Sequence, residues 1–340
     1  MKIFTERSKL LAVYFVSMIG LSLLNIFINV IPSTASDNDM DLIYSILSQV
    51  LCMGIIPFVG ALWAKKKEGE SPYSTMSSMI VDYGYTRKLS PICLLLLIPM
   101  AISFFGVTRL LSSVSVLLLT LMQYKFPMSA SSIYTSPWDL VAQLLLTAAL
   151  PAIFEEFTHR GLALDALKKR GSEASAIVLS GLLFALMHTN ILQFLYAFAG
   201  GCIFGLLAVK SKSIYPSMIL HFANNAIATL NEYADQYPDG AFGFIAKMND
   251  FWYSSIITSL FFGLILAANA VLFVFLTIAF VKHCPKEESV KPITLIKGKL
   301  YVDAFRPDGK PKLIDKAFVF ATVAMTALMT VSTYVWGLLR

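Results

Sequence analysis

Six side chains that could do chemistry interrupt otherwise apolar stretches of this sequence. In chain order they are Glu155, Glu156, Arg160, His188, His221 and Asn225. Ionisable groups are costly in an apolar environment and usually mark a function there. A carboxylate can act as a general base, and imidazole and amide N–H groups can donate hydrogen bonds to a developing oxyanion. These residue types predict acid–base chemistry at a shared site.

The spacing within each group suggests roles. Adjacent helical positions differ by about 100°, so Glu155 and Glu156 point in different directions. Glu156 and Arg160 are four residues apart and can form an ion pair on one helix face. Glu155 is then the less committed carboxylate and the better candidate for a general base. His221 and Asn225 are also four residues apart, so one helix face presents an imidazole and an amide.

Each group also has a purely structural interpretation. A histidine in an apolar helix often only joins helices by hydrogen bonding. The two glutamates could be a solvated helix end, and Glu156 and Arg160 could only hold a hairpin together. Their joint occurrence on neighbouring apolar segments favours a shared site. His159 and His283 are assigned no catalytic role.

The elements that must position these groups are membrane-spanning helices. Of 340 residues, 57% are hydrophobic and 14% are charged, and the mean hydropathy is +0.70. A soluble domain has about 45–50% apolar and about 25% charged residues. The apolar residues form runs of about 20, as a bilayer core of about 30 Å requires. We therefore predict an all-α, polytopic transmembrane helical bundle with about eight to nine spans.

Nine candidate spans can be read from these runs: residues 9–31, 42–64, 91–107, 138–156, 173–191, 194–209, 214–230, 255–281 and 317–338. The run that begins at residue 91 stays apolar to residue 122, which is too long for one vertical span. We expect a separate surface or re-entrant helix after residue 107.

Basic residues occupy alternate linkers, at 65–67, 168–170, 210–212 and 282–316. The linkers between them are acidic or neutral, as at 231–239. The positive-inside rule then places the N-terminus in the cytoplasm. We expect an integral, multi-pass protein of a bacterial plasma membrane.

We predict three regions along the chain. Residues 1–130 form N-terminal transmembrane helices, 131–235 a catalytic helical core, and 236–340 C-terminal helices joined by the basic cytoplasmic linker at 282–316. Counting 1.5 Å per residue from a hairpin tip near Gly171 places Glu156 and His188 at similar depth. This count predicts a shared site in the cytoplasmic half of the membrane.

Two other classes of protein fit the sequence less well. A nucleic-acid binder needs a contiguous basic footprint, whereas the net charge of +6 is spread over short clusters. The four cysteines, Cys52, Cys93, Cys202 and Cys284, have neither CxxC nor metal-finger spacing. We therefore expect no nucleic-acid partner and no cysteine-based metal or disulfide frame.

Three motifs occur in order on these segments: E-E-x-x-x-R at 155–160, F-x-x-x-H at 184–188 and H-x-x-x-N at 221–225. Together they resemble the CPBP family of CAAX proteases and bacteriocin-processing enzymes, also called the Abi family. The resemblance covers about residues 138–230 and implies an intramembrane endopeptidase of the type II CAAX prenyl protease kind. The implied partners are membrane lipid and a peptide or lipidated-protein substrate.

The resemblance also implies roles for individual residues. Glu155 would activate water, with His188 as its partner. His221 and Asn225 would form the oxyanion hole, and the remaining glutamate and arginine of the first motif would support the site. We expect no cofactor. The alternative is a zinc ion held by Glu155, His188 and His221, although HExxH is absent and asparagine is a poor zinc ligand.

Two further functions stay open on the sequence. The same groups could relay protons or ions in a membrane transporter, although no internal repeat is evident. The chain could also be a non-catalytic scaffold or a bacteriocin-immunity protein, as some relatives are thought to be.

Overall fold

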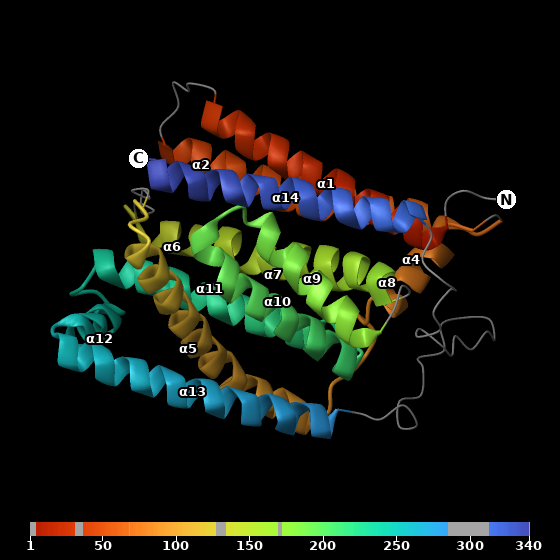
Figure 1. The fold of residues 1–340 in the computed structure, drawn as a ribbon. Helices are drawn as coiled ribbons and strands as arrows, with labels where there is room; N and C mark the ends of the chain where they lie inside the picture. Colours follow the sequence, from red (N-terminus) through yellow and green to blue (C-terminus); the bar gives the residue numbers. More distant parts are fainter. Residues whose placement is uncertain are drawn as a thin grey trace.

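The computed structural model of the chain describes residues 5–30, 37–67, 69–126, 134–168, 172–284 and 313–339. Every regular element in these ranges is a helix, and Figure 1 shows the long helices running roughly side by side in one bundle. The predicted all-α fold class is confirmed. Most of the predicted linker at 282–316 and the hairpin tip at 169–171 lie outside the described residues.

The N-terminal and C-terminal regions contribute helices on both sides of the predicted core. Their bounds are α1 (Glu6–Val30), α2 (Asp37–Ile46), the π-helical η1 (Leu47–Ile55), α3 (Ile56–Lys65), α4 (Pro72–Asp82), α5 (Pro91–Leu121), α12 (Gly243–Tyr253), α13 (Ile256–His283) and α14 (Leu313–Leu339).

The core region is built from one long composite helix and three further helices. The composite helix consists of α6 (Pro137–Gln143), η2 (Leu144–Ala149), α7 (Leu150–Glu156), η3 (Phe157–Ala163) and α8 (Leu164–Lys168), where η2 and η3 are π-helical. It is followed by α9 (Glu173–Met187), α10 (Ile191–Ser211) and α11 (Tyr215–Gln236).

Seven helices in the described part of the chain are long and apolar enough to cross a membrane: Glu6–Phe27, Leu42–Lys65, Pro91–Leu121, Trp138–Lys168, Ile191–Ser211, Ile256–His283 and Leu313–Val335. The chain is therefore an integral membrane protein with a polytopic helical bundle. Two of the nine predicted spans fall outside this set. Helix α9 is apolar but only 15 residues long, and α11 carries a polar face along much of its length.

The predicted break after residue 107 is wrong. Helix α5 is continuous over 31 residues, with Pro99 inside it. Arg109, which suggested the break, donates from Nη2 to the hydroxyl of Tyr253 at 3.2 Å. A polar partner from α12 thus satisfies this cation without ending the helix. At 1.5 Å per residue α5 is about 46 Å long, so it must tilt or project beyond a core of about 30 Å.

A buried lysine joins the first helices to the core. The ammonium of Lys65, at the end of α3, lies 2.7 Å from a carboxylate oxygen of Asp82, 3.2 Å from Asp165 on α8 and 3.3 Å from Glu6 on α1. A buried cation is tolerated only when opposite charges surround it. This cluster therefore holds α1, α3 and the end of α4 against the composite helix.

Small residues bring α9 and α10 into close contact. A Cβ placed on Gly201 would lie 2.8 Å from Gly181 Cα, and one placed on Gly181 would lie 2.6 Å from Cys202 Sγ. Such residues let helix backbones approach closely in membranes. The crossing also leaves the Gly201 carbonyl within reach of Arg160, whose Nη2 donates to it at 3.0 Å.

Candidate active site

The first two candidate residues lie on a helix whose backbone is interrupted just before them. Pro151 has no N–H, so it cannot donate to the carbonyl of Thr147 four residues earlier. The side chain of Asn225 on α11 donates to this carbonyl instead, at 2.9 Å. Freed backbone groups inside a membrane are satisfied by neighbouring helices in this way. The proline thus ties α11 to the composite helix close to Glu155.

The predicted pair of Glu156 and Arg160 is present and completely enclosed. The Arg160 Nη1 atom lies 3.2 Å from Glu156 Oε1, and their side chains are both 0% exposed. The guanidinium also lies 4.5 Å from the ring centroid of Phe184 and 5.2 Å from that of Phe204. Cation–π contacts of this kind stabilise a cation that has been removed from water.

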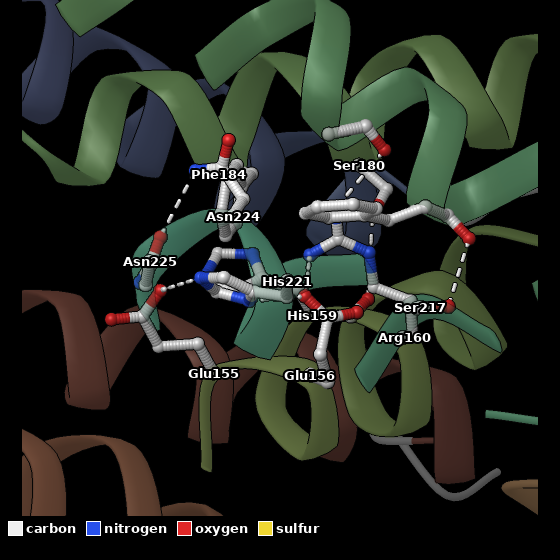
Figure 2. A network of polar contacts seen from close by, with 12 residues as sticks. Glu155, Glu156, His159, Arg160, Ser180, Phe184, Ser217, His221, Asn224 and Asn225 are labelled. Carbon is white, nitrogen blue, oxygen red and sulfur yellow. Dashed lines mark hydrogen bonds and ion pairs between the residues drawn. The ribbon is translucent and has the colours of Figure 1, made fainter. Parts of the chain in front are cut away.

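His221 lies between the two glutamates, as Figure 2 shows. Its Nδ1 atom is 3.0 Å from Glu156 Oε1, and its Nε2 atom is 3.9 Å from Glu155 Oε2. The imidazole ring stacks on Phe204 with a centroid distance of 5.3 Å. Glu156 thus fixes the orientation of the ring, and Nε2 points to the space beside Glu155.

One carboxylate oxygen of Glu155 accepts a hydrogen bond from the protein, and the other does not. Gln49 of η1 donates from Nε2 to Glu155 Oε1 at 2.7 Å. Glu155 Oε2 accepts no hydrogen bond from the described residues, although the residue is only 6% exposed. Buried polar atoms need a partner, so a water molecule or a substrate group is the expected one.

Sequence reasoning missed Gln49. Gln49 is a polar residue within the otherwise largely apolar predicted span 42–64. Polar side chains within such spans often join helices by hydrogen bonding. That signal could have raised it as a candidate. Its partner could not be foreseen, because the contact depends on how η1 packs against α7.

His188 caps the end of α9 and has a defined tautomer. Its Nδ1 atom lies 2.9 Å from the carbonyl oxygen of Phe184, and a carbonyl only accepts, so Nδ1 carries the proton. Nε2 is then the basic nitrogen. The helix ends at Met187, short of the predicted residue 191, because Thr189 adopts a left-handed φ of 48°.

The Asn225 amide is held by a chain of hydrogen bonds that runs through Asn224 to helix α5. Asn224 Nδ2 donates to Asn225 Oδ1 at 3.1 Å, and Thr108 on α5 donates to Asn224 Oδ1 at 2.7 Å. With Thr147 as acceptor on the other side, the orientation of the Asn225 amide is fixed, and its remaining N–H is the one available to a ligand.

Four of the six candidates face one cavity of about 610 Å³: Glu155, His188, His221 and Asn225. Glu156 and Arg160 do not line it and lie behind the ring of His221. The structure therefore brings all six predicted residues together and separates those that a ligand can contact from those that hold them.

The remaining imidazole of the first motif is placed elsewhere. His159 is completely buried, with Nδ1 3.3 Å from the hydroxyl of Tyr14 and Nε2 2.9 Å from Met187 Sδ. It does not line the cavity. This position agrees with the sequence analysis, which gave His159 no catalytic role.

The zinc alternative, a site formed by Glu155, His188 and His221, stays a prediction. Within the described ranges, no group of three His, Cys, Asp or Glu side chains has the geometry to hold a metal ion.

The comparisons with known proteins agree with this geometry. Residues 137–227 match the family model described as Type II CAAX prenyl endopeptidase Rce1-like, and the match contains all six candidate residues. No curated protein and no solved structure matches the chain. The resemblance to the CPBP family is therefore confirmed over residues 137–227, the region that is similar to the Rce1-like type II CAAX prenyl endopeptidases.

Proposed function

We propose that this protein hydrolyses a peptide bond of a membrane-associated or lipidated peptide, with Glu155 as the general base. The observation that supports the proposal most strongly is the buried, uncommitted Oε2 of Glu155 in the same cavity as His188, His221 and Asn225. General-base catalysis requires the base within hydrogen-bond reach of its water. No described residue donates a hydrogen bond to this oxygen, and the nearest charged partner is His221 Nε2 at 3.9 Å.

The geometry suggests a division of labour during hydrolysis. Glu155 removes a proton from water, the water oxygen attacks the carbonyl carbon, and the carbonyl oxygen becomes an oxyanion. The Nε2 atom of His188 accepts a hydrogen bond from the same water and positions it. The free N–H of Asn225 donates to the oxyanion, and His221 adds a second donor, Nε2–H, as an imidazolium, because its Nδ1–H is already held by the Glu156 carboxylate. The proton held by Glu155 then passes to the leaving amine as the C–N bond breaks.

Glu156 and Arg160 act through His221 and do not touch the substrate. Their ion pair leaves no net charge behind the imidazole, and it fixes Nδ1 so that Nε2 stays directed at the cavity. A preorganised donor needs no reorganisation when negative charge develops.

The proposal can be tested by comparing cells that express the wild-type protein, Glu155→Gln or His188→Ala. Mass spectrometry of membrane peptides should reveal products that appear only with the wild type. Glu173→Gln is a matched control, because this exposed glutamate pairs with Lys210 at the far end of α9. Equal melting temperatures in detergent would show that the variants fold.

Wild-type product levels with either active-site variant would overturn the proposal. Substrate-dependent proton flux in sealed vesicles, without any peptide product, would instead favour a transporter.

A further inference from the structure

The active-site cavity continues along α11 to the end of that helix. Beyond the site it is lined by Asn231, Glu232 and Asp235, and also by Arg109 of α5. A second cavity of about 420 Å³ shares three of these residues, Arg109, Asn231 and Asp235, and extends to α12. Figure 1 places α12 beside the C-terminal end of α11. The two cavities together form a path from Glu155 to this end of the bundle.

The mouth of this path is acidic. Among the described residues, three carboxylates line it, those of Glu232, Asp235 and Asp250, against one cation, Arg109. Asp235 and Asp250 are exposed, and neither forms a salt bridge with a described residue. A cleft lined by one sign of charge concentrates ligands of the opposite sign.

A second observation indicates that this cavity receives a ligand. Glu155 Oε2, at the inner end of the same cavity, is buried and makes no hydrogen bond to the described protein. A peptide bond attacked there must have part of its chain in the remainder of the cavity. Toward the mouth, the charged residues that line this remainder are Arg109, Glu232 and Asp235.

We propose that the peptide substrate enters through this mouth and carries a Lys or Arg side chain that binds Asp235 and Asp250, with Glu232 as a third contributor. This inference deepens the proposed peptidase function and rests on it. Asp235 lies 14 residues after His221 on α11, or about 21 Å along the helix. An extended peptide advances about 3.3 Å per residue, so the basic residue lies about six positions from the bond that is cut.

The position of the mouth also determines the side of entry. The basic linkers lie at the opposite ends of these helices, where Lys210 pairs with Glu173 and Lys65 with Asp165. With the topology that the positive-inside rule predicts, the acidic mouth faces away from the cytoplasm. The substrate segment is therefore extracytoplasmic.

A randomised peptide library, incubated with the purified protein in proteoliposomes, tests the preference. Mass spectrometry of the products should show Lys and Arg enriched at one position about six residues from the cut. In Asp235→Lys/Asp250→Lys the enrichment should change to Asp and Glu. Asp239→Asn is the matched control, because Asp239 pairs with Lys247 and lines neither cavity.

Each result has a distinct meaning. Cleavage without a charge preference, or an unchanged preference in the charge-reversed variant, would refute the inference and leave the peptidase intact. Enrichment of acidic residues by the wild type would also refute it, because Arg109 would then dominate the mouth. No difference in products between the wild type and Glu155→Gln would refute the peptidase itself, and the inference with it.

The side of entry has its own test. In right-side-out vesicles, a membrane-impermeant maleimide should label Asp235→Cys well above the wild type, whose four native cysteines provide the background. Labelling only after the membrane is permeabilised would refute extracytoplasmic entry.

Discussion

Replacing Arg160 by methionine should be among the most destabilising single changes in the core. The Arg160 side chain is 0% exposed, and its guanidinium pairs with Glu156 at 3.2 Å and donates to the Gly201 carbonyl at 3.0 Å. Methionine keeps the contacts with the aromatic rings but leaves the Glu156 carboxylate buried without its cation. Breaking a buried ion pair by removing one partner costs about 3–5 kcal/mol of unfolding free energy.

A double-mutant cycle separates the pair from its surroundings. Glu156→Gln removes the uncompensated charge, so Glu156→Gln/Arg160→Met should be more stable than Arg160→Met alone. For contacting residues, an interaction energy of about 0.5–3 kcal/mol is expected. Activity should not return, because a neutral amide replaces the carboxylate that holds His221 Nδ1.

Denaturant unfolding in detergent micelles provides the measurement. Arg109→Met is the matched control, because Arg109 is partly exposed and makes one hydrogen bond, to Tyr253. It should cost less than about 1 kcal/mol. The reasoning about the buried pair would be refuted if Arg160→Met matched the wild type, or if the costs of the two single changes simply added.

Three further predictions concern the packing and chemistry around the site. Gln49→Leu should lower kcat/KM about 10-fold or more, since it removes a hydrogen bond to a charged group. The control Gln143→Leu, which lies outside the cavity, should leave kcat/KM unchanged. Equal rates for the two variants would contradict this prediction. Gly181→Ala should lower the melting temperature, because the added Cβ would lie 2.6 Å from Cys202 Sγ. The control Gly263→Ala should not, because its added Cβ would have no atom within 4 Å. Identical melting curves would argue against the close crossing of α9 and α10. Activity should survive dialysis against a zinc chelator, and stoichiometric zinc lost together with activity would restore the metal hypothesis.

The sequence predicted the parts of the fold that depend on local pattern. Long apolar runs gave the helices, and the spacing of Glu156 and Arg160 gave the ion pair, because helical periodicity determines both. Counting residues on each side of one hairpin also predicted a similar depth for Glu156 and His188, which stays a prediction. The helices and the ion pair need no knowledge of which helices are neighbours in space.

The remaining features depend on contacts between segments distant in the sequence. The pairing of Gln49 with Glu155 spans 106 residues, and that of Arg109 with Tyr253 spans 144. The second contact explains why α5 continues where a break was predicted. The cavity reaches the acidic end of α11 because polar side chains line that helix to Asp235, a path that depth counting from the hairpin tip could not reveal.

The most direct test of the central claim compares kcat/KM for Glu155→Gln, His188→Gln and the double variant on one cleaved peptide. If both side chains act on the same water, the loss of either should cost about 10²–10⁴-fold. Residues that act as a unit are strongly non-additive, so the double variant should be no slower than the slower single variant. Multiplied losses, or wild-type rates for either single variant, would contradict a shared site.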